Sequence, residues 1–224
     1  IIGFIPSFTI LYLIIQKYSK FFEEGKVYLA FFAGMIFGMV AYFFHLLFDG
    51  FFLSAIDLAI LFYGMGFAGL EDMMKVVVLN YPSLQRKYDI TYYGCAFGSG
   101  FAGILIVVIS YRTFYVNPLS ITYIVLLLCY SISFSLLHIS LGGLIGYGLS
   151  KFLLFSYFIR AWLIHIIYNF ITLWMVGAYQ YWEIIPLFAF IYSFFIYLFI
   201  TKNILIDALP DEKRKEFRRW IRRG

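Results

Sequence analysis

The sequence predicts an all-α fold, a polytopic transmembrane helix bundle with about seven spans. Of its 224 residues, 63% are hydrophobic and only 13% are charged. The mean hydropathy of +0.90 lies far outside the range of soluble globular domains. The apolar residues also gather in runs of about 20, the length that a helix needs to cross the hydrocarbon core. Lipid is therefore the expected solvent for most of the chain.

The first two spans are expected at 1–15 and 27–48, where two apolar runs are separated by a more polar segment around Lys20. Gly34 and Gly38 are four residues apart in the second run. Small residues at this spacing allow helices in lipid to approach closely, and close approach is a main source of packing energy there. We therefore expect the second span to pack tightly against a neighbour.

The third and fourth spans are expected at 51–80 and 91–111. The third is too long for one perpendicular crossing, so it is expected to tilt, bend or project from the membrane. The fourth repeats the small-residue spacing with Gly94, Gly98 and Ala102, which again indicates close helix packing. Bending of the third span is least costly at its glycines, which are Gly64, Gly66 and Gly69.

The last three spans are expected at 119–150, 152–176 and 182–200. The fifth span, 119–150, is also longer than one crossing requires, so it is expected to tilt, bend or project into the cytoplasm, or else to divide into two. No soluble-domain linker or internal repeat interrupts the series. The glycines at which the fifth span is expected to bend are Gly142, Gly143, Gly146 and Gly148.

The spans form one membrane domain, residues 1–206, which is followed by a basic tail at 207–224. If the N-terminus lies outside, nearly all loop cations face the cytoplasm, and the exterior loops carry only Arg112. The positive-inside rule therefore favours an outside N-terminus and a cytoplasmic C-terminus, in a multi-pass protein of the cell membrane. The cytoplasmic cations are Lys17, Lys20, Lys26, Arg86, Lys87, Lys151, Lys202 and seven in the tail.

The tail reads DEKRKEFRRWIRRG from Asp211, with seven Lys and Arg residues against three acids. Phe217, Trp220 and Ile221 give this basic helix an apolar edge. Such an edge is expected to rest on an anionic leaflet and to anchor the topology. The lipid bilayer is therefore an expected partner, and nucleic acid is not.

Three ionisable residues lie together in the third span, in the run GLEDMMKVVVLN. Ionisable side chains within spans cost about 2.5–3.5 kcal/mol each on insertion scales, so they tend to face the bundle interior and to carry function. Glu71 and Lys75 are four residues apart and share a helix face, while Asp72 points about 100° away. We therefore expect one carboxylate to be paired and the other to be available.

Two histidines lie at a similar depth in later spans, His138 in the fifth and His165 in the sixth. With a rise of 1.5 Å per residue from the cytoplasmic ends, Glu71 lies about 13 Å in, His138 about 18 Å and His165 about 20 Å. The three side chains are therefore expected to meet in the inner half of the bilayer. Arg160 and Asn169 lie on the same span as His165, and Asn169 shares its face.

Two imidazoles and a carboxylate at one depth support two kinds of chemistry, both of which give hydrolysis. Glu71, His138 and His165 can hold a divalent metal such as zinc, which would activate water. Alternatively, without a cofactor, a carboxylate acts as general base and the imidazoles stabilise the oxyanion. Cys95 and Cys129 lack CxxC or Cys/His spacing, so neither a disulfide nor a thiolate metal site is expected.

Two other ionisable residues within the spans are assigned to structure. His45 lies near the outer end of the second span, where no other ionisable residue is expected at its depth. Asp57 lies in the outer half of the third span, where it could be a second buried acid or line an outer vestibule. Neither residue is therefore expected in the site.

Five short motifs also follow one another in a fixed order along the spans. They are Glu71-Asp72-x-x-Lys75, Asp89 with Tyr93 and Gly94, Gly98-x-Gly100-Phe101-Ala102, His138 with Gly142, and His165 with Asn169. In this order and placement the sequence resembles the PrsW-type membrane proteases, over roughly residues 18–200. The wider superfamily includes the CAAX prenyl endopeptidases and the anterior-pharynx-defective scaffold subunit of γ-secretase.

The resemblance implies a protease that cleaves a membrane-protein substrate near the membrane surface. Glu71 would activate the water and Asp72 would support it. Two residues differ from the family pattern, because Asp72 replaces a glutamate and Leu105 replaces an acid that often follows the glycine-rich segment. The implied catalytic residues are Glu71, Asp72, His138 and His165, with Lys75, Asn169 and Arg160 in supporting positions.

Two other functions use the same polar residues. A noncatalytic scaffold subunit, similar to the anterior-pharynx-defective protein, would use them as hydrogen bonds between helices and would bind a membrane-protein partner. A transporter of small solutes or protons would use the buried acids and Arg160. The sequence shows no inverted repeat and no paired broken helices, so a transporter is the least favoured of the three.

Overall fold

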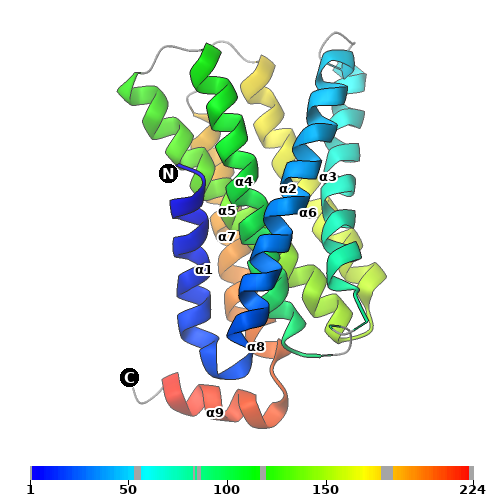
Figure 1. Ribbon diagram of the computed structural model, residues 1–224, viewed down its shortest axis with the longest axis vertical. Coiled ribbons are helices and arrows are strands. Elements are labelled where there is room, and N and C mark those ends of the chain that lie inside the picture. The colour runs from blue at the N-terminus through cyan, green and yellow to red at the C-terminus, as the bar shows by residue number, and fades with distance from the viewer. Residues whose placement is uncertain are drawn as a thin grey trace.

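The computed structural model describes residues 2–52, 57–82, 84, 87–116, 120–177 and 184–221, in which all of the regular structure is helical (Figure 1). A 3₁₀ turn, η1 (Ser19–Phe21), follows the first helix, and a π-helical turn, η2 (Ile200–Ile204), joins α7 to α8. The helices are α1 (Phe4–Tyr18), α2 (Glu24–Phe52), α3 (Asp57–Leu79), α4 (Ile90–Val116), α5 (Ile121–Ser150), α6 (Leu154–Gly177), α7 (Ile185–Phe199), α8 (Leu205–Ala208) and α9 (Asp211–Ile221).

Five helical segments of the described chain are long and apolar enough to cross a membrane. The predicted all-α fold is therefore confirmed, and the five segments are consistent with a membrane protein. The other two long elements are α1, with 15 residues, and α3, which carries the acids of the candidate site. The five segments are Glu24–Phe48, Ile90–Tyr111, Ile121–Ser150, Leu154–Thr172 and Ile185–Ala208.

Helix α4 lies at the centre of the bundle, packed against α1, α2 and α5 (Figure 1). Its glycines explain how the backbones come so close. A Cβ at Gly94 would overlap the carbonyl oxygen of Gly142 on α5, and a Cβ at Gly34 on α2 would overlap the carbonyl of Phe97. The close approach predicted from the small-residue spacing is therefore confirmed, and it holds α2 and α5 at fixed positions beside α4.

Helix α5 runs without interruption from Ile121 to Ser150, so a division of the fifth span is wrong. The glycines near its end serve packing instead. A Cβ at Gly142 would overlap the carbonyl of Gly94, and a Cβ at Gly146 would lie 2.6 Å from that of Ile90. The third span also starts later than predicted, because α2 continues to Phe52 and α3 begins at Asp57.

The end of the bundle at which α9 lies also holds the C-terminal end of α1 and the N-terminal end of α2 (Figure 1). The expectation that Phe217 rests on a lipid leaflet is wrong, because this side chain is only 1% exposed. Its ring stacks on Tyr18 of α1 at 4.7 Å, and Arg214 forms an ion pair of 2.9 Å with Asp207. Trp220, 51% exposed, remains on the outer surface of α9.

Candidate functional site

The two acids of α3 have different environments. Lys75 Nζ lies 2.7 Å from Asp72 Oδ1, and both side chains are fully buried. The same ammonium donates to the backbone carbonyl oxygen of Glu71 at 3.3 Å. The sequence correctly predicted that one carboxylate is paired, but Asp72, three residues away, is the partner and not Glu71, four residues away. Glu71 is therefore the acid that is available to other groups.

His138 lies on α5 against the centre of the bundle. A Cβ at Gly98 of α4 would overlap the carbonyl oxygen of His138, so this glycine brings the histidine backbone against α4. Its ring lies between two aromatic rings, 5.1 Å from Phe101 and 4.2 Å from Phe134. The Nε2 atom lies 3.6 Å from Glu71 Oε2. Packing between α4 and α5 thus directs the His138 imidazole toward the carboxylate of Glu71 on α3.

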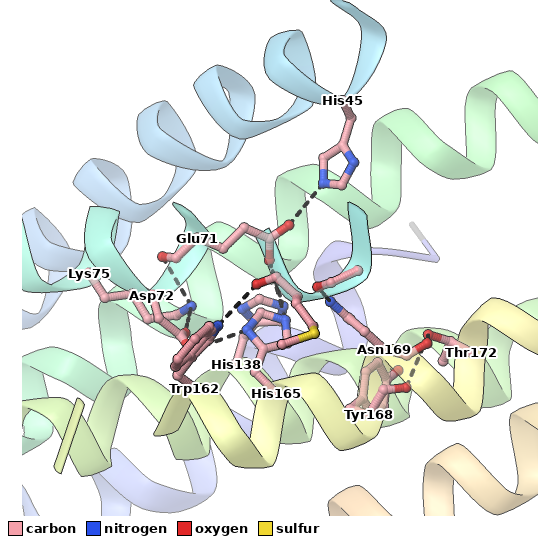
Figure 2. A network of polar contacts seen from close by, with 12 residues as sticks. His45, Glu71, Asp72, Lys75, His138, Trp162, His165, Tyr168, Asn169 and Thr172 are labelled. Atoms are coloured by element: carbon pink, nitrogen blue, oxygen red, sulfur yellow. Dashed lines mark hydrogen bonds and ion pairs between the residues drawn. The ribbon is translucent and has the colours of Figure 1, made fainter. Parts of the chain in front are cut away.

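His165 on α6 contacts both acids. Its Nε2 lies 3.5 Å from Glu71 Oε2, and its Nδ1 lies 3.3 Å from Asp72 Oδ2. The rings of His165 and His138 meet edge to face, with centroids 5.0 Å apart. A carboxylate beside one ring nitrogen orients the imidazole and leaves the other nitrogen for a metal, water or substrate. Asp72 Oδ2 is the carboxylate oxygen nearest to Nδ1, although neither atom makes a hydrogen bond in the described structure, and Lys75 balances the charge of Asp72 (Figure 2).

His45 on α2 belongs to the same cluster, so the expectation that it has no ionisable partner at its depth is wrong. Its Nε2 lies 2.9 Å from Glu71 Oε1 (Figure 2). Its Nδ1 lies 2.8 Å from the hydroxyl of Tyr63. Its ring also stacks on Phe67 at 4.1 Å. Tyr63, Phe67 and Glu71 follow one another at a spacing of four on α3, so they form one face toward α2. That spacing is the sequence signal that could have identified this contact.

Side chains of α6 also bond to the backbone of α3. Asn169 Nδ2 donates to the carbonyl oxygen of Gly64 at 2.9 Å, and Trp162 Nε1 donates to that of Met65 at 3.0 Å. Asn169 lies on the face of His165, as predicted, and these two bonds hold α6 beside the glycine-rich segment that precedes Glu71. Asn169 therefore supports the site by joining α6 to α3. Trp162 was not identified from the sequence.

The remaining predicted residues lie away from the cluster or outside the described side chains. Arg160 is exposed on α6 and lies 4.7 Å from the ring of Tyr157, so its expected supporting position at the site is wrong. Asp57 is the first residue of α3, but its side chain lies outside the described part of the structure. Cys95 and Cys129 are not joined by a disulfide in the described structure.

Glu71, His138 and His165 meet at one point although they come from three helices. One donor atom from each lies within 4.8 Å of the others. Ligands about 2.0–2.2 Å from a tetrahedral zinc are roughly 3.3–3.6 Å apart, which agrees with the 3.5 Å and 3.6 Å distances from Glu71 Oε2 to the imidazoles. Glu71 Oε2 and both ring nitrogens of His138 have no hydrogen-bond partner in the described structure. The donor set thus fits a divalent metal such as zinc, and also a bound water.

The charges of the cluster do not balance when its histidines are neutral. Lys75 neutralises Asp72, so Glu71 carries the one negative charge that is not balanced. Glu71 as a residue is only 4% exposed. A buried charge without compensation costs several kcal/mol. An imidazolium or a bound cation would remove this cost. The convergence expected from the sequence is confirmed as geometry, and the catalytic role of these residues stays a prediction.

No known protein family, curated protein or solved structure matched the chain.

Proposed function

We propose that the protein is a membrane-embedded protease of the PrsW type, which hydrolyses a peptide bond of a membrane-protein substrate. The proposal is supported above all by the convergence of Glu71, His138 and His165. Side chains that only join helices satisfy each other's hydrogen bonds, because an unpaired buried polar group costs about 1–3 kcal/mol. Here Glu71 Oε2 and the His138 ring remain unpaired in the described structure. Unpaired groups aimed at one point are what a site for water and substrate requires.

Each side chain has a role that follows from its contacts. Glu71 Oε2 takes a proton from water, the resulting hydroxide attacks the carbonyl carbon, and Glu71 then passes the proton to the departing amine. Asp72, 3.3 Å from His165 Nδ1, favours a proton on that nitrogen. As an imidazolium, His165 donates from Nε2 to the oxyanion, and His138 adds a second donor when its Nε2 carries hydrogen.

The same donors would hold a divalent metal, which when bound would polarise the water and the carbonyl group. Glu71 Oε2, His138 Nε2 and His165 Nε2 are the atoms that would ligate it, and Asp72 would orient His165. Titration of the purified protein with Co²⁺ separates the two routes. A metal-dependent site binds one ion per chain and loses it in His138→Ala, whereas a metal-free site cleaves equally well in the presence of a chelator.

We also propose that α1 and α3 lie in the bilayer with the five apolar segments, which gives seven spans in the cell membrane. The N-terminus is outside and α9 lies at the cytoplasmic surface. This orientation is supported by the position of Lys17, Lys20, Lys87 and Lys151, which all lie next to helix ends on the α9 side of the bundle. It would put the cluster closer to the cytoplasm than to the exterior.

The proteolytic function is tested by co-reconstituting the purified protein in liposomes with detergent-solubilised membrane proteins of a host, followed by mass spectrometry of new N-termini. Removal of a general base typically costs about 10²–10⁴-fold in rate. Glu71→Gln is therefore expected to abolish the new N-termini. Glu23→Gln is the matched control, because Glu23 is an exposed acid that is paired with Lys26. The same new N-termini from folded Glu71→Gln protein would rule out the proposal.

A noncatalytic scaffold is the second candidate, and the closed state of the site favours it. Glu71, His138 and His165 are at most 4% exposed, so helices must part before a peptide reaches them. A scaffold would use the cluster to hold α2, α3, α5 and α6 together. It predicts that His138→Ala lowers the thermal stability strongly while the protein cleaves nothing and co-purifies with a membrane-protein partner.

A further inference from the structure

His45 makes two hydrogen bonds, and its contact with Glu71 determines which ring nitrogen carries the hydrogen when the imidazole is neutral. An ionised carboxylate only accepts hydrogen bonds. Since His45 Nε2 lies 2.9 Å from Glu71 Oε1, Nε2 must carry the hydrogen. In a neutral imidazole Nδ1 is then an acceptor, so the Tyr63 hydroxyl, 2.8 Å away, donates to it. The contacts form a directed chain from Tyr63 through His45 to Glu71.

The hydrogen bonds from Tyr63 through His45 reach only one of the two carboxylate oxygens of Glu71. Oε1 accepts from His45, and Oε2 faces His138 and His165 at 3.6 Å and 3.5 Å. A glutamate side chain has three rotatable bonds, and its carboxylate could turn away from the imidazoles if neither oxygen were held. The bond to His45 therefore sets the orientation in which Oε2 meets the two histidines (Figure 2).

The His45 ring is itself held firmly. It stacks on Phe67 at 4.1 Å, and the ring of Tyr63 lies 4.3 Å from that of Phe67. Its side chain is 26% exposed, whereas that of Glu71 is 6% exposed and those of His138 and His165 are at most 1%. His45 thus stands at the edge of the cluster, between the buried acid and the surface of the bundle.

We propose that His45 is a positioning residue of the site, which acts through Glu71 and is itself oriented by Tyr63. This role rests on the proposed hydrolytic function, because it concerns the carboxylate that activates water. Loss of an orienting partner around a reactive group typically costs 10–100-fold in activity or metal affinity. The role requires a hydrogen-bond donor at Nε2 and does not require a group that titrates.

Kinetics of three variants test the role. His45→Leu removes the donor and should lower kcat about 10–100-fold with little change in KM, because in this role His45 acts on Glu71 rather than on the substrate. His45→Gln keeps an N–H donor near the position of Nε2 and should restore most of the lost kcat. Tyr63→Phe, which removes only the hydroxyl, should lower kcat less than His45→Leu does. Wild-type kcat in His45→Leu, or equal losses in the leucine and glutamine variants, would overturn the role.

A second measurement needs no activity. The chain has three histidines, so ¹⁵N-histidine labelling in nanodiscs gives three pairs of ring signals, and His45→Gln identifies one pair. We expect His45 to carry its hydrogen on Nε2, Glu71→Gln to shift that signal, and Tyr63→Phe to shift Nδ1. Glu23→Gln, a substitution of an exposed acid, should shift neither. A hydrogen on Nδ1 of His45, or a His45 Nε2 signal that does not shift in Glu71→Gln, would contradict the proposed direction of these hydrogen bonds.

The two measurements separate this role from the proposed function. Cleavage that survives Glu71→Gln would overturn hydrolysis at this site and with it the positioning role, whatever the ring signals show. Cleavage that is lost in Glu71→Gln but is unchanged in His45→Leu would overturn the role of His45 alone.

Discussion

Replacement of Lys75 by methionine tests whether the cluster depends on charge compensation in the bundle interior. Methionine has nearly the volume of lysine but lacks the ammonium, which lies 2.7 Å from Asp72 Oδ1 with both side chains 0% exposed. The change leaves a buried carboxylate without its partner, and breaking a buried pair in this way costs about 3–5 kcal/mol. It also removes the bond to the Glu71 carbonyl oxygen and the contact with the Phe101 ring, 4.9 Å away.

The assay is equilibrium unfolding in bicelles, with Lys26→Met as a matched control. Lys26 and Glu23 are also a pair three residues apart, at 2.6 Å, but their side chains are 32% and 66% exposed. Exposed pairs contribute little, so Lys26→Met should unfold like the wild type. The double variant Lys75→Met with Asp72→Asn removes both charges and should recover much of the loss. Equal free energies of unfolding for Lys75→Met and Lys26→Met would refute this reasoning.

Two further substitutions test the packing that positions the site. Gly94→Ala sets a methyl group against the carbonyl oxygen of Gly142, so thermal unfolding should show a loss of about 1–3 kcal/mol in stability. Gly66→Ala is the control and should show no loss, because a Cβ there meets nothing within 4 Å. Equal losses in the two variants would contradict the packing of α4 on α5. Phe217→Ala removes a side chain that is 1% exposed, which costs about 3–5 kcal/mol, so α9 should be released and cut at least about 100-fold faster by trypsin. Trp220→Ala changes a residue that is 51% exposed and should leave the cutting rate unchanged. Slow cutting in both variants would mean that Phe217 does not hold α9.

The convergence of the site could be predicted from the sequence because the helix ends from which depth was counted agree with those in the structure. Helix α3 ends at Leu79, α5 ends at Ser150 and α6 begins at Leu154, close to the ends that the apolar runs indicate. Depths counted from those ends therefore brought Glu71, His138 and His165 to a similar height. The hydrophobic content and the length of the apolar runs predicted the helical bundle in the same way, through length and composition rather than through specific contacts.

His45 could not be found by counting depth, because side-chain direction decides its contact. It lies seven residues before the end of α2 at Phe52, whereas Glu71 lies fourteen residues after the start of α3 at Asp57. At 1.5 Å per residue, the two backbones differ in height by about 10 Å. Side chains tilt toward the N-terminus of their helix, and α2 and α3 run in opposite directions. His45 and Glu71 therefore lean toward each other across this difference.

The partner of Lys75 also depended on a contact that the sequence does not show. Positions three and four residues away on a helix are both within reach of a lysine, so Asp72 and Glu71 were equally available from spacing alone. In the structure Glu71 turns toward His45 on α2, and Asp72 is left to the lysine. The contact of His45 on α2 with Glu71 therefore determines which of the two acids on α3 pairs with Lys75.

Cleavage by the purified protein measures most directly whether the side chains of separate helices work as one site. The comparison uses Glu71→Gln, His165→Ala and the variant that carries both. Catalytic residues that act as a unit are strongly non-additive, so each single variant should lose about 10²–10⁴-fold in rate and the double variant should be no slower than the slower single one. Losses that multiply in the double variant, or wild-type cleavage by either single variant, would contradict a shared site.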